Sequence, residues 1–362
     1  MVQTPVNPHT IPSSTHQFTQ LQVLDQIPDG LLDLEPHQLA DFLRQPTLIH
    51  LSGLQDPPLF VSVLLHGNET TGWLAMRELL RKYQDAPLPR SLSLFIGNIS
   101  AARCGLRHFP DQPDYNRIWA GDANSTSLEE QMAQRVIAEM QQRGVFASID
   151  IHNNTGRNPH YGCITRLDSQ SLFLAKSFAP VAVYYTAPTT TQAYAFAKLC
   201  PAIILESGQP NLPDGTAHAL EFVEQFLHLT EIPCQPMTDL ALFHTVAILK
   251  VPEVVTFEFG NNDEESAVNL RFPEEMDHMN FCELAAGTVV AHIENETEQE
   301  SNCLSLPLIA WDESGQDQTE RFLTRVGNQI QLRQNLMPAM ITLNCEIVRS
   351  DCLCYLMERY PV

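Results

Sequence analysis

Short apolar runs alternate with longer stretches of helical periodicity over the first two-thirds of the chain. The run at 59–65 (LFVSVLL) predicts a buried strand, and the stretch at 71–83 that follows it predicts an amphipathic helix. Ser127 and Glu130 have the spacing of a helix capping box, and Gly144 closes the helical stretch that they introduce. Further strands are predicted at 92–96, 146–151 and 202–205, and a further helix at 215–229. This alternation predicts an α/β fold, with a mostly parallel or mixed sheet and helices on both faces.

The pattern changes near residue 235, after a segment that contains two prolines. Beyond it helical periods are rare, and β-rich runs dominate at 243–251, 254–259, 304–311 and 340–348. We therefore predict a loose N-terminal arm over 1–18, a larger α/β domain over 19–235 and a smaller β-rich C-terminal domain over 236–362.

The composition excludes several classes of partner. Of 362 residues, 21 are Lys or Arg and 43 are Asp or Glu, which gives a net charge of −22. Such a balance argues against binding to nucleic acid or to an anionic membrane. The N-terminus has no secretory pattern, no apolar run approaches the ~18 residues of a membrane span, and the nine cysteines form no C-x-x-C motif. We expect a soluble, reduced, cytoplasmic protein.

The charge is distributed unevenly along the chain. Residues 253–300 contain 13 acidic residues against one basic residue, Arg271, whereas seven arginines lie between Arg103 and Arg166. The acidic stretch is typical of a solvated face. An acidic protein that binds an anion must concentrate its few arginines in one place, so the arginine-rich region is a candidate binding region.

Two histidines and a glutamate follow predicted strands. His66 and Glu69, in the segment HGNE, come directly after the strand at 59–65, and His152 ends the strand FASIDIH. Two His and one Glu with an open fourth position form the ligand set of a catalytic zinc, and Asp150 has the spacing to hold the imidazole of His152. Each residue taken singly also fits a hydrogen-bonded residue at a strand end. The carboxyl edge of an α/β sheet, where ligands bind, favours the zinc interpretation.

A third strand end and a loop complete the candidate site. Glu206 ends the apolar strand AIILE, where an unpaired carboxylate is costly to bury but serves as a general base beside a water molecule. The loop after the strand at 92–96 holds Arg103, Arg107 and Arg117, and Arg157 follows His152 in the chain; guanidinium groups bind carboxylates and stabilise oxyanions. The alternatives are a solvent-facing Glu and surface arginines that pair with a very acidic protein.

The order of these motifs resembles the succinylglutamate desuccinylase/aspartoacylase family of zinc carboxypeptidase-like hydrolases. HGNE is followed by an arginine-rich loop closing in D-x-N-R, then by D-x-H-N, then by an apolar strand that ends in Glu, and together these cover roughly residues 50–230. The resemblance implies that the domain over 19–235 is catalytic and that the β-rich domain follows it. It also implies a single Zn²⁺ held by His66, Glu69 and His152, with Glu206 as the general base.

The same resemblance implies roles for the loop residues. Arg107 would polarise the substrate carbonyl, or Arg103 in its place, because the interval from Arg107 to Arg117 is longer than the family pattern. Residues 186–205 hold no arginine and only Lys198, which departs from the aspartoacylases and argues against N-acetylaspartate as substrate. The substrate-binding candidates are Asn116, Arg117, Arg103, Arg157 and Tyr161.

The resulting hypothesis is a zinc-dependent hydrolase that cleaves the amide bond of a small N-acylated amino acid or related anion. Its partner would be that small anionic substrate, without nucleic acid or membrane, and the sequence leaves a homo-oligomer open. A metallocarboxypeptidase acting on peptides would use the same residues. A non-catalytic metal- or ligand-binding protein on the same fold is the alternative of another class.

Overall fold

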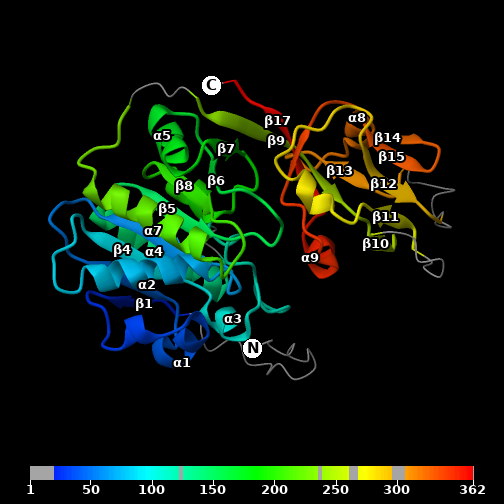
Figure 1. Ribbon diagram of the computed structural model, residues 1–362. Helices are drawn as coiled ribbons and strands as arrows, with labels where there is room; N and C mark the ends of the chain where they lie inside the picture. Colours follow the sequence, from blue (N-terminus) through cyan, green and yellow to red (C-terminus); the bar gives the residue numbers. More distant parts are fainter. Residues whose placement is uncertain (1–19, 122–124, 235–238, 261–267, 296–305, 362) are drawn as a thin grey trace.

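The computed structural model describes residues 20–121, 125–234, 239–260, 268–295 and 306–361. These residues form a twelve-stranded sheet flanked by helices and a separate five-stranded sheet. Figure 1 shows the large sheet and its helices on the left and the small sheet on the right, with β9 and β17 running between them. The α/β fold class with an additional β-rich C-terminal region is thus confirmed. The predicted arm over 1–18 lies outside the described residues.

The large sheet is mixed, with a parallel centre. β4, β3, β5 and β8 are parallel to one another, whereas β2, β6, β17, β16 and β13 pair antiparallel with a neighbour. In sheet order its strands are β1 (Gln22–Leu24), β2 (Thr47–Leu51), β4 (Leu92–Ile96), β3 (Leu59–Val63), β5 (Ser148–His152), β8 (Ala202–Glu206), β6 (Tyr161–Ile164), β7 (Val181–Tyr184), β9 (Ala241–Lys250), β17 (Cys354–Arg359) and β16 (Met337–Ala339), with β13 (Ile309–Trp311) paired to β9.

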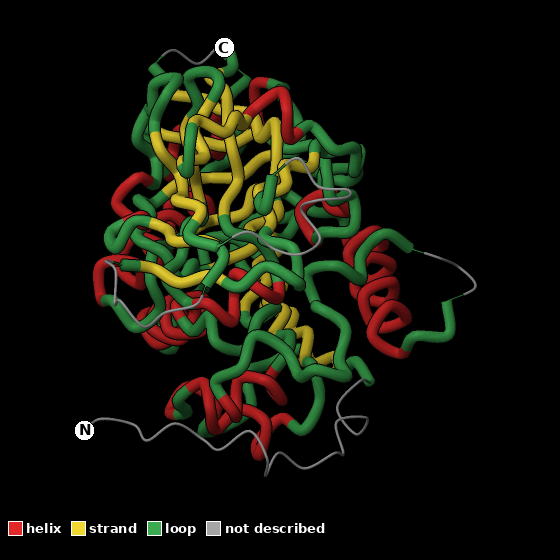
Figure 2. The backbone as a smooth tube through the Cα atoms, turned by 90° about the vertical axis from the view of Figure 1, so that its right-hand side faces the viewer, coloured by secondary structure: helices red, strands yellow, loops and turns green. Residues whose placement is uncertain are grey.

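Helices pack against both faces of this sheet (Figure 2). Successive strand residues serve opposite faces: Ile203 joins the core with Trp73 and Phe226, and Ile204 joins the core with Phe196. The helices are α1 (Leu39–Leu43), α2 (Thr71–Lys82), α3 (Ile99–Cys104), α4 (Leu128–Arg143), α5 (Ser169–Phe178), α6 (Gln192–Phe196), α7 (Pro213–His228), α8 (Thr319–Phe322) and α9 (Cys345–Ser350), with short 3-10 turns η3 (Leu31–Asp33), η4 (Pro36–Gln38) and η5 (Met276–Met279).

The N-cap half of the capping-box prediction for α4 is confirmed, whereas the Ser127 N–H donates to the Ser125 hydroxyl at 3.1 Å and not to the Glu130 side chain. The Ser127 hydroxyl accepts a hydrogen bond from the backbone N–H of Glu130 at 3.3 Å, and Gly144 at the other end has a φ of 73°. The Ser127 bond satisfies one of the donors that every helix N-terminus leaves unpaired.

The C-terminal region belongs to two sheets. The five-stranded sheet has the order β10 (Phe257–Phe259), β11 (Leu270–Phe272), β12 (Val289–Ile293), β15 (Gln329–Leu332) and β14 (Leu323–Val326). β9, which starts after the predicted boundary at 235, pairs with β7 and extends the large sheet. The division into domains at that residue stays a prediction.

The strand predicted at 340–348 is wrong. β16 ends at Ala339, Met340 adopts a positive φ of 64°, and α9 begins at Cys345. The Asn344 side chain accepts hydrogen bonds from the backbone N–H groups of Glu346 and Ile347, so a side-chain cap starts a helix where the apolar run favoured a strand.

Within the described part of the chain, no helix has both the length and the apolar composition needed to cross a membrane.

Candidate active site

Three adjacent parallel strands carry the predicted residues to one edge of the sheet. His66 lies just beyond the end of β3, and His152 and Glu206 are the last residues of β5 and β8. The register places Val63 opposite Ile151, and His152 opposite Glu206. Because the carboxyl ends of parallel strands meet at one edge, residues more than a hundred positions apart converge there.

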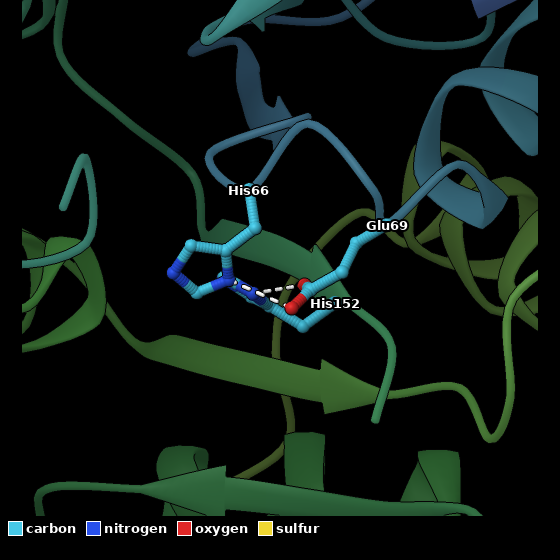
Figure 3. Close-up of side chains that lie close together, drawn as sticks. All are labelled: His66, Glu69 and His152. Carbon is cyan, nitrogen blue, oxygen red and sulfur yellow. Dashed lines mark hydrogen bonds and ion pairs between the residues drawn. The ribbon is translucent and has the colours of Figure 1, made fainter. Parts of the chain in front are cut away.

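The side chains of His66, Glu69 and His152 point toward one another (Figure 3). The Nδ1 atom of His66 lies 2.8 Å from one oxygen of Glu69, and Nδ1 of His152 lies 2.7 Å from the other. All three side chains are buried, and one ligand atom from each lies within 4.8 Å of the others. The structure therefore brings the three predicted metal ligands together.

Each imidazole is held from behind by a second carboxylate. Nε2 of His66 lies 2.9 Å from Asp114, and Nε2 of His152 lies 2.8 Å from Asp150, which confirms the predicted contact between Asp150 and His152. Asp150 is fully buried and also accepts a hydrogen bond from the Ser62 hydroxyl at 2.6 Å. These contacts fix the ring orientations and leave both Nδ1 atoms facing the centre.

Gly67 lets the HGNE loop approach the next loop closely. A Cβ at this position would lie 2.2 Å from the backbone nitrogen of Ala102 and 2.4 Å from the carbonyl carbon of Ala101. The Gly67 N–H donates to the carbonyl of Arg107 at 3.0 Å. The glycine is thus required by backbone packing, which joins the HGNE loop to the arginine-rich loop.

In the triad, burial and neighbouring charges shift the pKa values in opposite directions. Burial alone would raise the pKa of Glu69, but the two imidazoles hold the pKa of this carboxyl well below its usual range. Burial would lower the pKa of His152, yet Asp150 and Glu69 raise that pKa well above its usual value. The site is therefore built to place positive charge next to Glu69.

Glu206 is buried beside the triad in a different environment. Burial raises its pKa to about 8, and the side-chain amide of Asn154 donates to its carboxylate at 3.4 Å. A divalent cation at the triad would lower this pKa again. A carboxylate that titrates near neutrality can both accept and return a proton.

Arg107 spans the triad and its supporting carboxylate. One guanidinium nitrogen lies 3.6 Å from Glu69, and the other donates to Asp114 at 3.0 Å. Although burial opposes it, Asp114, Glu69 and Asp351 raise the pKa of Arg107, so the group is always charged.

Asn116 and Arg117 follow Asp114 in the same loop and line the same cavity. The Asn116 amide lies 3.3 Å from Nε2 of His152, and its oxygen accepts from the N–H of Gln192. Arg117 donates to the carbonyl of Asn116 at 3.0 Å, and within the described part of the chain it forms no ion pair. Its charge is thus available to a ligand.

The structure does not bring the other two predicted arginines to this cavity. Arg103 forms an exposed ion pair with Asp41, and Arg157 contacts His278. Neither residue is among those that line the cavity. Tyr161 does line it, and its hydroxyl donates to the sulfur of Met340 at 2.8 Å.

A cavity of about 670 Å³ opens over the triad. Its wall includes residues from the C-terminal region as well as from the edge of the parallel strands. Among those that the sequence did not indicate are Cys163, Tyr185, Thr245, Asp351, Tyr355 and Met357. They lie on strands, or beside them, that carry no motif, so nothing in the local sequence marks them.

The donor set fits a zinc ion. Two imidazole nitrogens and a carboxylate converge, the ligands are buried, and each imidazole has a carboxylate on its outer nitrogen. This is the set found at catalytic zinc sites, which keep a fourth position for water or substrate.

Comparison with protein families gives a match over residues 55–220 to the model described as succinylglutamate desuccinylase/aspartoacylase catalytic domain. A comparison with curated proteins finds no match.

Solved structures show the same fold. The succinylglutamate desuccinylase/aspartoacylase from Rhodobacter sphaeroides superposes with a TM-score of 0.57 at 14% identity, covering 86% of this chain and 88% of that one. The ectoine utilization protein EutE from Ruegeria pomeroyi gives 0.55 at 14% identity, covering 86% and 88%. Murine aminoacylase 3 gives 0.53 at 16% identity, covering 85% and 97%. Residues 55–220 thus resemble the catalytic domain of the succinylglutamate desuccinylase/aspartoacylase family, and the fold is the one seen in these solved structures.

Proposed function

We propose that this protein is a zinc-dependent amidohydrolase that removes the acyl group from a small N-acylated amino acid. The observation that carries the proposal is the convergence of His66, Glu69 and His152 at one sheet edge, beside the buried Glu206. The family match over residues 55–220 supports the reaction class.

When bound at the triad, zinc would supply a Lewis acid that polarises the amide carbonyl and acidifies water. Glu206 would take the proton from the attacking water and return it to the leaving amine. Its burial and its pKa of about 8 suit both transfers.

Arg107 and Arg117 would have different roles toward the substrate. Arg107, held at 3.6 Å from Glu69, would stabilise negative charge that develops on the carbonyl oxygen. Arg117, with no ion pair among the described residues, would bind the substrate carboxylate, as would the neighbouring Asn116.

A metallocarboxypeptidase would use the same residues on a peptide. Residues 339–357 of the C-terminal region contribute to the wall of the cavity, and a wall on that side favours a small molecule over a chain that must continue outward. A panel of N-acyl amino acids assayed beside short peptides separates the two activities.

The test of the proposal is Glu206→Gln. We expect this variant to retain one zinc per chain by elemental analysis while turnover of every N-acyl amino acid in the panel falls by about 100-fold or more. Retained turnover would contradict the role of Glu206. A zinc-loaded, unaltered protein without hydrolysis would instead favour a non-catalytic binding protein.

A further inference from the structure

Side chains from five neighbouring strands line the cavity from one face of the large sheet. Ile204 on β8 lies opposite Cys163 on β6, and Cys163 lies opposite Val183 on β7. Further along, Thr245 on β9 lies opposite Met357 on β17. Directly paired residues point to the same face of a sheet, and all five line the cavity. We call Cys163, Val183, Ile204, Thr245 and Met357 the apolar floor.

The side chains of the floor are held in place because they continue into a packed core. Val183 and Met357 are 6% and 1% exposed and belong to one cluster with Tyr161 and Phe243. A side chain placed on the floor would therefore meet carbon and sulfur atoms held by the sheet. Contact of this kind is stabilising for an apolar group and costly for a charged one.

Few arginine or lysine side chains line the cavity. Among the described residues, the only Arg or Lys side chains that line it are Arg107 and Arg117. Arg107 already contacts Glu69 and Asp114. One guanidinium, that of Arg117, is left for a substrate carboxylate.

Negative charge lines the cavity as well. Asp351 and Glu346, from the segment around α9, are part of its wall. A second carboxylate on the substrate would meet these acids and the apolar floor, with no further arginine to neutralise it. The cavity therefore suits a ligand with a single negative charge.

Arg117 and the apolar floor line the same cavity. The charge of Arg117 acts on Tyr185 and on Tyr355, opposing the rise in pKa that burial imposes on both phenols. Tyr185 follows β7 two residues after Val183, and Tyr355 precedes Met357 by two residues on β17, so each flanks the floor. A ligand bound in this cavity can therefore meet both Arg117 and the apolar floor.

We propose that the substrate is an N-acyl derivative of a monocarboxylic amino acid with a bulky, uncharged side chain, and that this side chain packs on the apolar floor. The proposal rests on the amidohydrolase function proposed above and names its substrate class. It excludes dicarboxylic amino acids as preferred substrates.

The first experiment compares matched substrates on the zinc-loaded, full-length protein. N-acetyl-leucine and N-acetylaspartate have side chains of nearly equal size and shape, so they differ mainly in charge. We expect kcat/KM for N-acetyl-leucine to be about 100-fold higher than kcat/KM for N-acetylaspartate. It should also be about 10-fold higher than kcat/KM for N-acetylalanine. The free amino acids leucine and aspartate, used as competitive inhibitors, should follow the same order.

A matched pair of variants tests the floor itself. Thr245→Lys introduces a cation among the floor residues, and Thr245→Met introduces a neutral side chain of similar length. We expect Thr245→Lys to lower kcat/KM for N-acetyl-leucine about 10-fold relative to Thr245→Met and to raise it for N-acetylaspartate. If Thr245→Lys does not fold, the substrate and inhibitor series with the unaltered protein decides alone.

The outcomes separate this inference from the function on which it rests. Hydrolysis of N-acetylaspartate or N-succinylglutamate at a kcat/KM equal to that of N-acetyl-leucine would overturn the substrate class and leave the amidohydrolase standing. A preference that follows the length of the acyl chain, with no dependence on the amino acid, would also overturn it. Absence of hydrolysis across the whole panel would overturn the proposed function.

Discussion

The two histidines of the triad are supported by two different kinds of structure. His152 is the last residue of β5, and its support, Asp150 with Ser62, comes from buried, paired strands. His66 lies on a loop, and its support, Asp114, comes from a second loop. We call these the strand side and the loop side. The strand side is fixed by the sheet, whereas the loop side depends on contacts between loops, such as the close approach at Gly67.

The two sides also differ in the other residues that their carboxylates contact. Asp114 contacts both His66 and Arg107. Its carboxylate also accepts a hydrogen bond from the backbone N–H of Asn116, two residues further along the chain. Asp150 contacts His152 and Ser62, and Ser62 is not among the residues that line the cavity. A change on the loop side should therefore disturb substrate handling, and a change on the strand side should disturb metal binding alone.

Glu69 joins the two sides, so its replacement should have the largest effect. In Glu69→Gln the amide cannot carry the negative charge that faces both imidazoles. We expect the variant to purify without stoichiometric zinc and to show no turnover, as measured by elemental analysis and by the N-acyl amino acid assay. A variant with a full complement of zinc would contradict the assignment of Glu69 as a ligand.

Asp150→Asn and Asp114→Asn compare the sides directly. Each should weaken zinc binding by about 10–100-fold, measured by competition with a chelator, because each removes the carboxylate behind a ligand imidazole. At saturating zinc, Asp150→Asn should recover most of its activity. Asp114→Asn should stay impaired, because Arg107 loses an ion pair. Equal recovery of both variants would remove the distinction between the two sides.

Stability against pH should separate Glu206 from Asp114 in the metal-free protein. The folded-state pKa of Glu206 is raised to about 8, so its burial destabilises the fold progressively as pH rises from about 4.5 through 8. Glu206→Gln should therefore raise the free energy of unfolding at pH 9 by more than ~1.4 kcal/mol, with little change at pH 4.5.

Asp114 should change the free energy of unfolding with pH in the opposite direction. Burial opposes ionisation there, but His66, Arg107 and Arg117 hold the pKa of Asp114 well below its usual range. Its contribution to stability is present above the unfolded-state pKa and is lost as pH falls. Urea unfolding of each variant at several pH values measures both trends, and parallel curves for the two would contradict them.

Ser62→Ala should have the smallest effect. It removes the hydroxyl that donates to Asp150 at 2.6 Å and leaves His152 in contact with the other oxygen. We expect a loss of about 1 kcal/mol in the free energy of unfolding, with zinc content unchanged. A large loss of zinc would show that Ser62 determines the position of Asp150.

The strand side, and the convergence of the motifs at one edge of the sheet, were predictable from the sequence. Apolar runs that end in His or Glu mark parallel strands whose ends meet, so His152 and Glu206 converge as expected. HGNE follows such a run too, and its convergence with His152 was predicted on the same ground.

The loop side and the cavity wall were predictable only in part. Four arginines had equal local context, but only tertiary packing decides that Arg107 reaches Glu69 whereas Arg103 pairs with Asp41. The floor depends on pairing between strands far apart in sequence, as between Thr245 and Met357, and no local pattern encodes that pairing.

β9 connects the two regions of the chain, because it contributes residues to the cores of both. Its first half pairs with β7 and contributes Phe243 to a core of the large sheet, and its second half contributes Ala247 and Leu249 to the C-terminal core. A chain cut near residue 235 would leave β7 as an open edge with unpaired N–H and C=O groups, a template for aggregation. The catalytic sheet and the C-terminal region therefore have to be expressed, stored and engineered as one piece.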